Sequence, residues 1–175
     1  MNQNMSKIGY RVMAATLRWF KKEPYMRQRL EFAGIDEGKV VLDYGSGPGY
    51  FAALAAEMVG PSGKVYAADV QPIVREYVDK LCGQHGLKNI DVIITDCDTS
   101  LPDRSVDVVL LFDNLHVFDD PRTILEEMRR VLRDDGTLCV DVHHMPLEKA
   151  IAMVEGGGFT KGEELDNTIN FSKDL

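Results

Sequence analysis

Cysteine, long apolar runs and an apolar amino-terminal segment are scarce in this sequence or missing from it. The three cysteines, Cys82, Cys97 and Cys139, form neither a pair nor a CxxC pattern, so a reducing cytoplasm is the simplest compartment. The longest apolar runs have the length of strands, well short of the roughly 18–20 residues that span a membrane. The first twelve residues, MNQNMSKIGYRV, hold no apolar core of a secretory signal. We therefore expect a cytoplasmic protein without integral membrane contact.

A broad basic face is also missing. The net charge is −8, although residues 1–30 carry seven Lys and Arg against one acidic residue. The rest of the chain is therefore strongly acidic, and we expect no nucleic-acid partner, because neutralising phosphates needs a basic surface. For the basic segment, which contains Trp19 and Phe20, an amphipathic helix packed on the domain is the simpler interpretation. Peripheral contact with an anionic membrane is the alternative.

Strand and helix patterns alternate along the chain, whose 175 residues suit one domain. Residues 8–33 are expected to be helical with a break near Pro24, and residues 160–173 to form an antiparallel hairpin. The expected strands are 39–44, 64–68, 90–95, 106–112 and 137–142. The expected later helices are 50–60, 72–83, 121–132 and 146–155. Five alternations predict an α/β fold with a parallel sheet covered by helices on both faces.

The segment VVLDYGSGPGYFA, residues 40–52, places glycines at alternate positions directly after the first strand. A dinucleotide fingerprint would need glycine at position 50, where this chain has Tyr50, and the Lys-Ser/Thr pair of a phosphate-binding loop is missing. The loop therefore suits close approach of a ligand to the backbone, but not a pyrophosphate. An NAD-dependent oxidoreductase is disfavoured for the same reason.

Carboxylates stand at the ends of the next two strands, where ligands of parallel sheets bind. Asp69 can accept hydrogen bonds from both hydroxyls of a ribose, or cap the following helix. Asp96 can accept one from an exocyclic amine, with Asp98 as the alternative. Val70 and Cys97 would form walls for a flat base. Together these residues predict a nucleoside whose remaining part lies over the glycines.

The segments VLDYGSGPGYFA, VYAADVQP, ITDCDTSLP, VDVVLLFDNLHVFDDP and RVLRDDGTLCVD resemble, in order and spacing, the motifs of class I S-adenosylmethionine-dependent methyltransferases. The similarity covers about residues 35–142 and is closest to small-molecule enzymes such as those of quinone biosynthesis. It implies a Rossmann-like three-layer sandwich with a mostly parallel seven-stranded sheet and a terminal antiparallel hairpin. We expect an N-terminal helical cap over residues 1–34 and the cofactor-binding methyltransferase domain over residues 35–175.

The resemblance also implies roles for individual residues towards S-adenosylmethionine. Gly45 and Gly47 would pass under the methionyl group, Asp69 would bind the ribose, and Asp96 the adenine amine. The backbone around Phe112 would face the methionine amino group. The other expected cofactor-binding residues are Asp43, Ser46, Gly49, Val70 and Cys97. For Asp43, orienting the loop through backbone N–H groups is an equally good interpretation.

Methyl transfer from an activated sulfonium needs no metal and no protein nucleophile, and a base only where the acceptor must lose a proton. The candidates for catalysis are His116, His143 and Tyr10, and packing roles are open for each. His143 and His144 with Asp141 resemble a metal site. Adjacent histidines on an extended chain point in opposite directions, however, so we expect no metal.

Two further residue groups are open to two interpretations. Cys97 and Cys139 suit buried positions better than the role of thiolate nucleophiles. Tyr10, Tyr25 and Tyr50 are candidate lid residues, although core packing is the better interpretation for Tyr50.

Only HHMP separates the fifth strand from the next helix, where related enzymes commonly carry an insertion. We therefore expect an open acceptor site that suits a bulky substrate or is completed by a homodimer. The sequence predicts an S-adenosylmethionine-dependent methyltransferase acting on a small-molecule acceptor. The alternative is a protein that binds the cofactor without transferring its methyl group.

Overall fold

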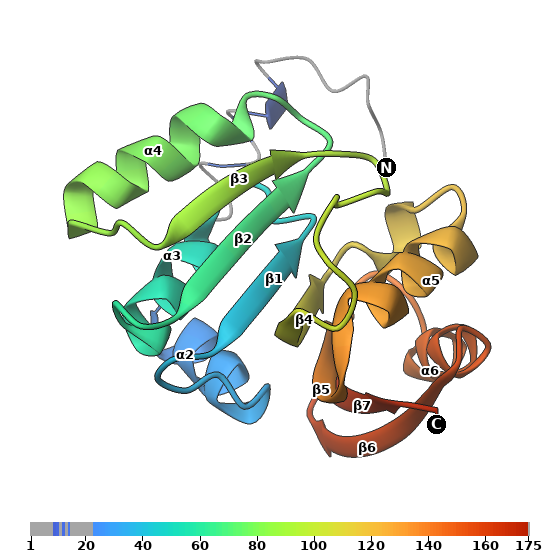
Figure 1. Cartoon of the computed structure of the whole chain (residues 1–175). Helices are drawn as coiled ribbons and strands as arrows, with labels where there is room; N and C mark the ends of the chain where they lie inside the picture. The colour runs from blue at the N-terminus through green and yellow to red at the C-terminus, as the bar shows by residue number, and fades with distance from the viewer. Residues whose placement is uncertain (1–8, 11, 13, 15–22, 175) are drawn as a thin grey trace.

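The computed structural model describes residues 9, 10, 12, 14 and 23–174. A seven-stranded sheet with the order β3-β2-β1-β4-β5-β7-β6 forms its centre (Figure 1). The strands are β1 Val40–Tyr44, β2 Lys64–Asp69, β3 Ile90–Ile94, β4 Val106–Phe112, β5 Leu132–Asp141, β6 Phe159–Leu165 and β7 Thr168–Lys173. The first five strands pair in parallel, and β7 pairs antiparallel with both β5 and β6. The predicted fold and its terminal hairpin are confirmed.

Helices cover both faces of the sheet (Figure 1). The helices are α2 Glu23–Phe32, α3 Tyr50–Val59, α4 Val74–His85, the 3-10 helix η1 Leu115–Val117, α5 Pro121–Val131 and α6 Leu147–Glu155. One apolar core joins α2, α3 and α4 to the sheet, and a second joins α5 and α6 to its other face. Between the two cores, β4 is buried almost throughout, which explains its continuous apolar sequence, VDVVLLF.

Local chemistry explains where the helices begin and end. Helix α5 begins with Pro121, and the Asp120 carboxylate accepts a hydrogen bond from the Thr123 N–H at 3.3 Å, which satisfies one of the free donors of the first turn. Helix α4 ends at Gly86, whose φ of +68° suits a residue without a Cβ. The alanines of α3 are buried against the sheet, so this helix approaches the strands closely.

The start of β5 differs from the prediction. Residues 133–136, RDDG, were expected to turn between a helix ending at residue 132 and a strand from residue 137, but β5 already begins at Leu132. Leu132 pairs with Val106, whereas Thr137 pairs with Val108, so the extra residues are accommodated as an irregularity in the ladder. An ion pair of 2.9 Å between Arg133 and Asp107 crosses the two strands there. Polar turn-forming residues thus lie within a strand because it bulges locally.

Residues 9, 10, 12 and 14 are helical, and α2 begins at Glu23 with Pro24 in its first turn. The predicted break near Pro24 stays a prediction, because residues 15–22 lie outside the described part of the chain. Trp19 and Phe20, on which the membrane hypothesis rests, lie outside the described residues. Within the described part of the chain, no helix is long and apolar enough to cross a bilayer. The division into a cap of residues 1–34 and a domain of residues 35–175 stays a prediction.

Candidate functional site

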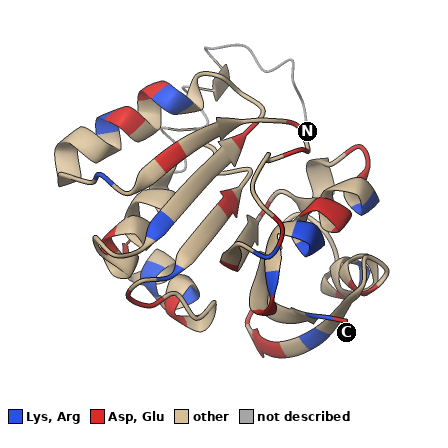
Figure 2. Ribbon diagram, viewed as in Figure 1, with Lys and Arg blue, Asp and Glu red and all other residues tan. Residues whose placement is uncertain are grey.

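The carboxyl ends of β1, β2 and β4 meet at one edge of the sheet, where β1 lies between the other two strands. This is the position at which ligands bind in open α/β sheets. The loop of residues 45–49 begins here, and the N–H groups of Gly45 and Ser46 donate to the Ala68 carbonyl at 2.8 and 3.0 Å. Acidic residues mark the tips of β1 and β2 (Figure 2). The predicted glycines and carboxylates therefore lie together.

The three glycines of the loop serve two purposes. All three have positive φ, and a Cβ at Gly45 would overlap the Asn114 side chain, while one at Gly49 would stand 2.7 Å from a methyl of Val78. These two positions need glycine because protein packs against them. At Gly47, whose φ is +53°, a Cβ would meet no atom of the described residues within 4 Å. Gly47 therefore keeps its side of the loop clear for a ligand, which fits a cofactor lying over the backbone.

Four strand-end side chains share one face of the sheet. Each stands two residues after a strand residue of the core beneath α2–α4, and side chains alternate between faces. The pairs are Val41 and Asp43, Ala67 and Asp69, Leu110 and Phe112, and Cys139 and Asp141. This row extends from β2 across β1 and β4 to β5. The row therefore extends in both directions from the glycine loop that follows β1, and an elongated ligand could lie along it.

Asp69 supports the glycine loop. Its side chain is 5% exposed, and its two oxygens accept hydrogen bonds from the N–H groups of Gly47 at 2.9 Å and Gln71 at 2.8 Å. Burial raises the pKa of the Asp69 carboxyl, and the backbone hydrogen bonds oppose that shift. The alternative role as a helix cap is wrong, because Ile73 precedes α4 and no side chain caps this helix. Binding of a ribose by Asp69 stays a prediction.

Tyr10 lies beside the same carboxylates. It is 1% exposed, its ring centroid is 5.5 Å from that of Tyr77, and its hydroxyl has no hydrogen-bond partner among the described residues. Burial, followed by the negative charges of Asp69 and, more weakly, Asp43, raises the pKa of this hydroxyl well above its ordinary value. A buried, unpartnered hydroxyl next to acids is a group that a polar ligand would satisfy.

Two other tyrosines were candidate lid residues. The Tyr50 hydroxyl donates to the Ala14 carbonyl at 3.3 Å, so residues of the N-terminal segment lie over the start of α3. Tyr25 lies elsewhere, at the end of β5. Tyr10 and Tyr50 therefore lie near Asp69 and the start of α3, and Tyr25 lies near the end of β5.

The carboxylates after β3 differ in their surroundings. Asp98 accepts a hydrogen bond from the Ser100 N–H at 2.7 Å, so it stabilises its own loop. Asp96 lies two residues beyond β3 and Asp98 two residues further on, and both are exposed. Cys97 and Val70 are half-buried beside these positions.

The two candidate thiols are not activated. Burial raises the pKa of the Cys97 thiol, and nearby acids raise it further. Cys139 is fully buried, and burial likewise raises the pKa of its thiol. Neither environment favours a thiolate, in agreement with the predicted packing roles.

Asn114 is a site residue that the sequence analysis missed. It follows β4, its side-chain N–H donates to the Tyr44 carbonyl at the end of β1, and it covers Gly45. Its carbonyl oxygen is buried without a partner among the described residues. Phe112, 7% exposed, packs edge-to-face on Phe51 at 4.7 Å. A polar residue directly after a buried strand was the available signal, but its contact with Gly45 depends on strand order.

At the end of β5 lies a second missed feature, a buried ion pair. Arg29 of α2 is 4% exposed, Asp141 is 2% exposed, and the Arg29 Nε lies 2.9 Å from the Asp141 Oδ2. The Thr168 hydroxyl donates to the same oxygen at 3.0 Å, and the Tyr25 hydroxyl is 3.4 Å from it. Burial, then the charge of Asp141, raises the pKa of Tyr25 to about 12. An aspartate inside an apolar strand signals a partner, but the partner is distant in sequence.

The histidines near this edge face different groups. His143 Nε2 lies 2.8 Å from Asp141 Oδ1, whereas His144 Nε2 lies 3.3 Å from Asp113 Oδ2. His116 is exposed, and its ring packs against that of His144 at 5.1 Å. The two adjacent histidines thus diverge as expected. Among the described residues, no group of three or more His, Cys, Asp or Glu is arranged to hold a metal ion.

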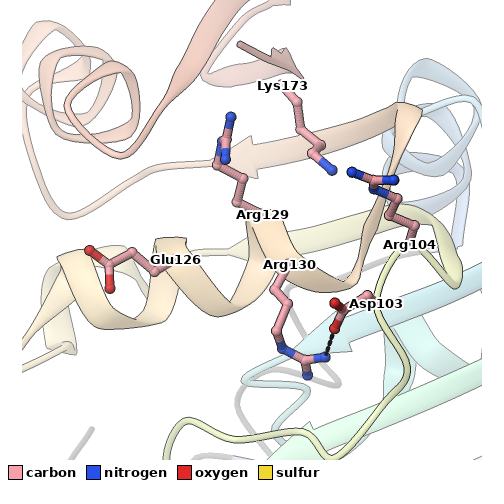
Figure 3. A pocket seen from close by; sticks show the side chains of 6 residues that line it. All are labelled: Asp103, Arg104, Glu126, Arg129, Arg130 and Lys173. Atoms are coloured by element: carbon pink, nitrogen blue, oxygen red, sulfur yellow. Dashed lines mark hydrogen bonds and ion pairs between the residues drawn. The ribbon is translucent and has the colours of Figure 1, made fainter. Parts of the chain in front are cut away.

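A hollow of about 660 Å³ lies away from this site, at the amino end of β4 (Figure 3). It is lined by Asp103, Arg104, Glu126, Arg129, Arg130 and Lys173. Its cations already have internal partners: Arg130 pairs with Asp103 at 2.6 Å, and Arg129 donates to the Asp174 carbonyl at 2.7 Å. The charged residues of this hollow therefore attach α5 to the neighbouring segments, and we do not assign a ligand to it.

Comparison with known proteins assigns the family. The model of the family described as "Methyltransferase domain" matches residues 35–168. The ubiquinone/menaquinone biosynthesis C-methyltransferase UbiE of Hydrogenovibrio crunogenus is 32% identical over 134 residues, covering 75% of this chain and 53% of that protein. The protein-L-isoaspartate O-methyltransferase of Ignicoccus hospitalis is 29% identical over 131 residues, covering 73% and 60%. The chain thus spans about half the length of the quinone methyltransferases that it matches.

Solved structures share the fold. A SAM-dependent methyltransferase from Aquifex aeolicus superimposes with a TM-score of 0.78 at 23% identity, covering 92% of this chain and 98% of that one. A structure from Methanococcus maripaludis gives 0.80 at 14% identity, covering 98% and 94%. The family model covers most of the sequence, and the seven-stranded sheet agrees with it. We conclude that the chain belongs to the methyltransferase domain family, for which S-adenosylmethionine is the implied cofactor.

Proposed function

We propose that this protein transfers a methyl group from S-adenosylmethionine to a small-molecule acceptor in the cytoplasm. The observation that carries the proposal is the open backbone at Gly47 beside the buried Asp69. Both lie at the carboxyl end of β1 or β2, where the strand order of the sheet changes direction between β2 and β4. The similarity to enzymes named for ubiquinone and menaquinone biosynthesis supports a small-molecule acceptor. The three free cysteines support a reducing compartment.

Each part of the cofactor has residues to bind it. The methionyl group would lie over Gly45, Ser46, Gly47 and Gly49, with the backbone at Phe112 towards its amino group. The ribose hydroxyls would meet Asp69, whose oxygens each have a lone pair beyond the backbone hydrogen bond that they accept. Asp43 lies buried in the same row, at 3% exposure. It would support the loop or contact the ligand directly.

The adenine would lie beyond the end of β3. Asp96 would accept from its amine, with Val70 and Cys97 beside the ring. We assign the amine to Asp96 because it lies nearer to the end of β3 than Asp98. This assignment is specific enough to be tested by single substitutions.

The sulfonium of the bound cofactor supplies an activated methyl group, so the protein has to orient the reactants and exclude water. Tyr10 would exclude water from above, since its ring is already buried beside Asp69. The acceptor would lie towards β5, under α2. Only residues 142–146 separate β5 from α6, which supports the hypothesis of an open acceptor site. Completion of that site by a homodimer, and membrane contact through residues 1–30, stay predictions.

Calorimetric titration of S-adenosylmethionine and S-adenosylhomocysteine into the wild type tests the proposal. We expect binding to be lost in Asp69→Ala, weakened in Asp96→Ala and nearly unchanged in Asp98→Ala, the matched control. Absence of binding to the folded wild-type protein would contradict the proposal. Transfer of a labelled methyl group to a panel of small acceptors then tests catalysis. Tight binding with no transfer would favour a protein that only binds the cofactor.

A further inference from the structure

The side chains at the carboxyl end of β5 form a connected polar cluster around a single exposed imidazole. His143 Nε2 lies 2.8 Å from Asp141 Oδ1 and 3.0 Å from the Tyr25 hydroxyl. The Asp141 side chain is 3% exposed, whereas that of His143 is 37% exposed. The Tyr25 hydroxyl therefore joins a buried carboxylate to an imidazole that solvent and small molecules can reach.

The contacts of Asp141 and Tyr25 indicate which ring nitrogen of His143 carries the proton. Arg29 and Thr168 bond to Oδ2, whereas Oδ1 accepts no hydrogen bond from the described residues and lies 2.8 Å from His143 Nε2 as an ion-pair contact. The Tyr25 hydroxyl donates to Asp141 Oδ2 at 3.4 Å and can therefore only accept from His143 Nε2 at 3.0 Å. Nε2 thus carries the proton, and Nδ1 of the neutral ring is an acceptor. The contact to Nδ1 is long, 3.4 Å from the Asn167 side-chain nitrogen. Nδ1 is therefore the basic atom that a ligand can engage.

The cluster also lies close to the end of β4. Asp141 is the register partner of Phe112, and the Asp113 N–H donates to the Asp141 carbonyl at 2.7 Å. The His143 N–H in turn donates to Asp113 Oδ1 at 3.3 Å. Neighbouring strands lie about 4.8 Å apart, so β5 is roughly 10 Å from β1 across β4. His143, which follows β5, therefore lies on the same edge of the sheet as the glycine loop, about two strands away from it.

We propose that His143 is the general base that removes a proton from the acceptor, and that Asp141 and Tyr25 are positioning residues. The inference rests on the proposed function. The O–H bond of an acceptor hydroxyl breaks as an N–H bond forms at Nδ1, and the electron pair stays on the acceptor oxygen as the nucleophile. Asp141 stabilises the resulting imidazolium, which returns its proton to water. An imidazole is matched to a hydroxyl of phenolic acidity rather than to an aliphatic alcohol, so the acceptor class is a phenol-like hydroxyl.

Several charged and titratable groups surround His143 and enter its pH response. They are Tyr25 and Arg29 of α2, Asp113 after β4, Asp141 of β5, neighbouring His144 and, through Arg29 at 3.6 Å, Asp166. His144 lies on the same loop but faces Asp113. It is therefore the matched control for His143.

The test uses 4-nitrophenol as a probe, with and without S-adenosylhomocysteine, because its phenolate absorbs visibly. We expect the half-ionisation pH of the bound probe to fall by about one unit, a roughly tenfold change in the phenolate ratio at fixed pH. His143→Gln should abolish this shift while the protein stays folded, and His144→Gln should retain it. In ¹⁵N spectra, the His143 ring should gain a proton at Nδ1 when the probe binds. Tyr25→Phe should reduce the shift without removing it.

Two results would overturn the proposal. One is that the probe does not bind, or binds with unchanged ionisation; the other is that His143→Gln ionises it as the wild type does. Cofactor titration on the same samples separates this failure from failure of the proposed function. Cofactor binding without ionisation of the probe leaves the methyltransferase proposal standing and removes the base. Absence of cofactor binding removes the function itself.

Discussion

Replacing Arg29 by Met would leave the Asp141 carboxylate buried without its cation. Arg29 and Asp141 are 4% and 2% exposed, and 2.9 Å separates their charged groups. Removing one partner of a buried ion pair costs about 3–5 kcal/mol, because the remaining charge cannot return to water. The guanidinium also stacks on Tyr25, with its carbon 3.6 Å from the ring centroid. Methionine fills similar space, so we expect Arg29→Met to lose about 3–5 kcal/mol of unfolding free energy.

Urea denaturation followed by circular dichroism measures this loss directly. For a chain of this size we also expect the melting temperature to fall by about 6–20 °C. Arg27→Met, on the same helix, is the control, since its ion pair with Glu23 is exposed and worth about 0.5 kcal/mol or less. The double variant Arg29→Met/Asp141→Asn should lose less unfolding free energy than the two single variants lose together, because no buried charge is left without a partner. A loss below about 1 kcal/mol in Arg29→Met, or simple additivity in the double variant, would refute this reasoning.

Three further predictions follow from the site. In Gly49→Ala the alanine would have a φ of +77° and a Cβ 2.7 Å from Val78, so we expect the unfolding free energy to fall by about 2–4 kcal/mol. The control is Gly86→Ala, where no described atom lies within 4 Å of the new Cβ and the expected loss is about 1 kcal/mol. Denaturation curves of both variants measure these losses. Because burial raises the pKa of Asp69, the folded state binds its proton more tightly. The stability advantage of wild type over Asp69→Ala should therefore grow as pH falls through the folded pKa, levelling off below the ordinary 3.8, in urea titrations at stepped pH. The pKa of Tyr25 is about 12, so its contribution to stability should be lost as pH rises from about 10 to 12, and ultraviolet titration of Tyr25→Phe should lack that ionisation.

The sequence alone was sufficient to predict the order of strands and helices and the edge that holds the site. Alternating apolar segments predict parallel strands, and the carboxyl ends of parallel strands necessarily meet at one edge. Asp69 and Gly47 could therefore be placed together before the structure was known, and the structure joins them by a 2.9 Å hydrogen bond. The resemblance to methyltransferases rests on the same segments, and the family match confirms it.

Local patterns predicted less well where tertiary contacts override them. RDDG has the composition of a turn, yet the ladder with β4 holds it within β5. Residues 133–136 have no register partner in β4, and the pairs on either side of them, Leu132 with Val106 and Thr137 with Val108, keep them within β5 as a bulge.

Only the tertiary structure decided which side chains meet across the site. Asn114 covers Gly45, and the imidazole of His143 is held by Asp141 and Tyr25. Arg29 and Asp141 are 112 residues apart in sequence. The sequence reveals a buried acid in β5 but not its partner, because any cation on a helix covering that face would satisfy it. Strand order and helix packing choose among those cations, since a buried charge is stable only where a specific partner lies within bonding distance.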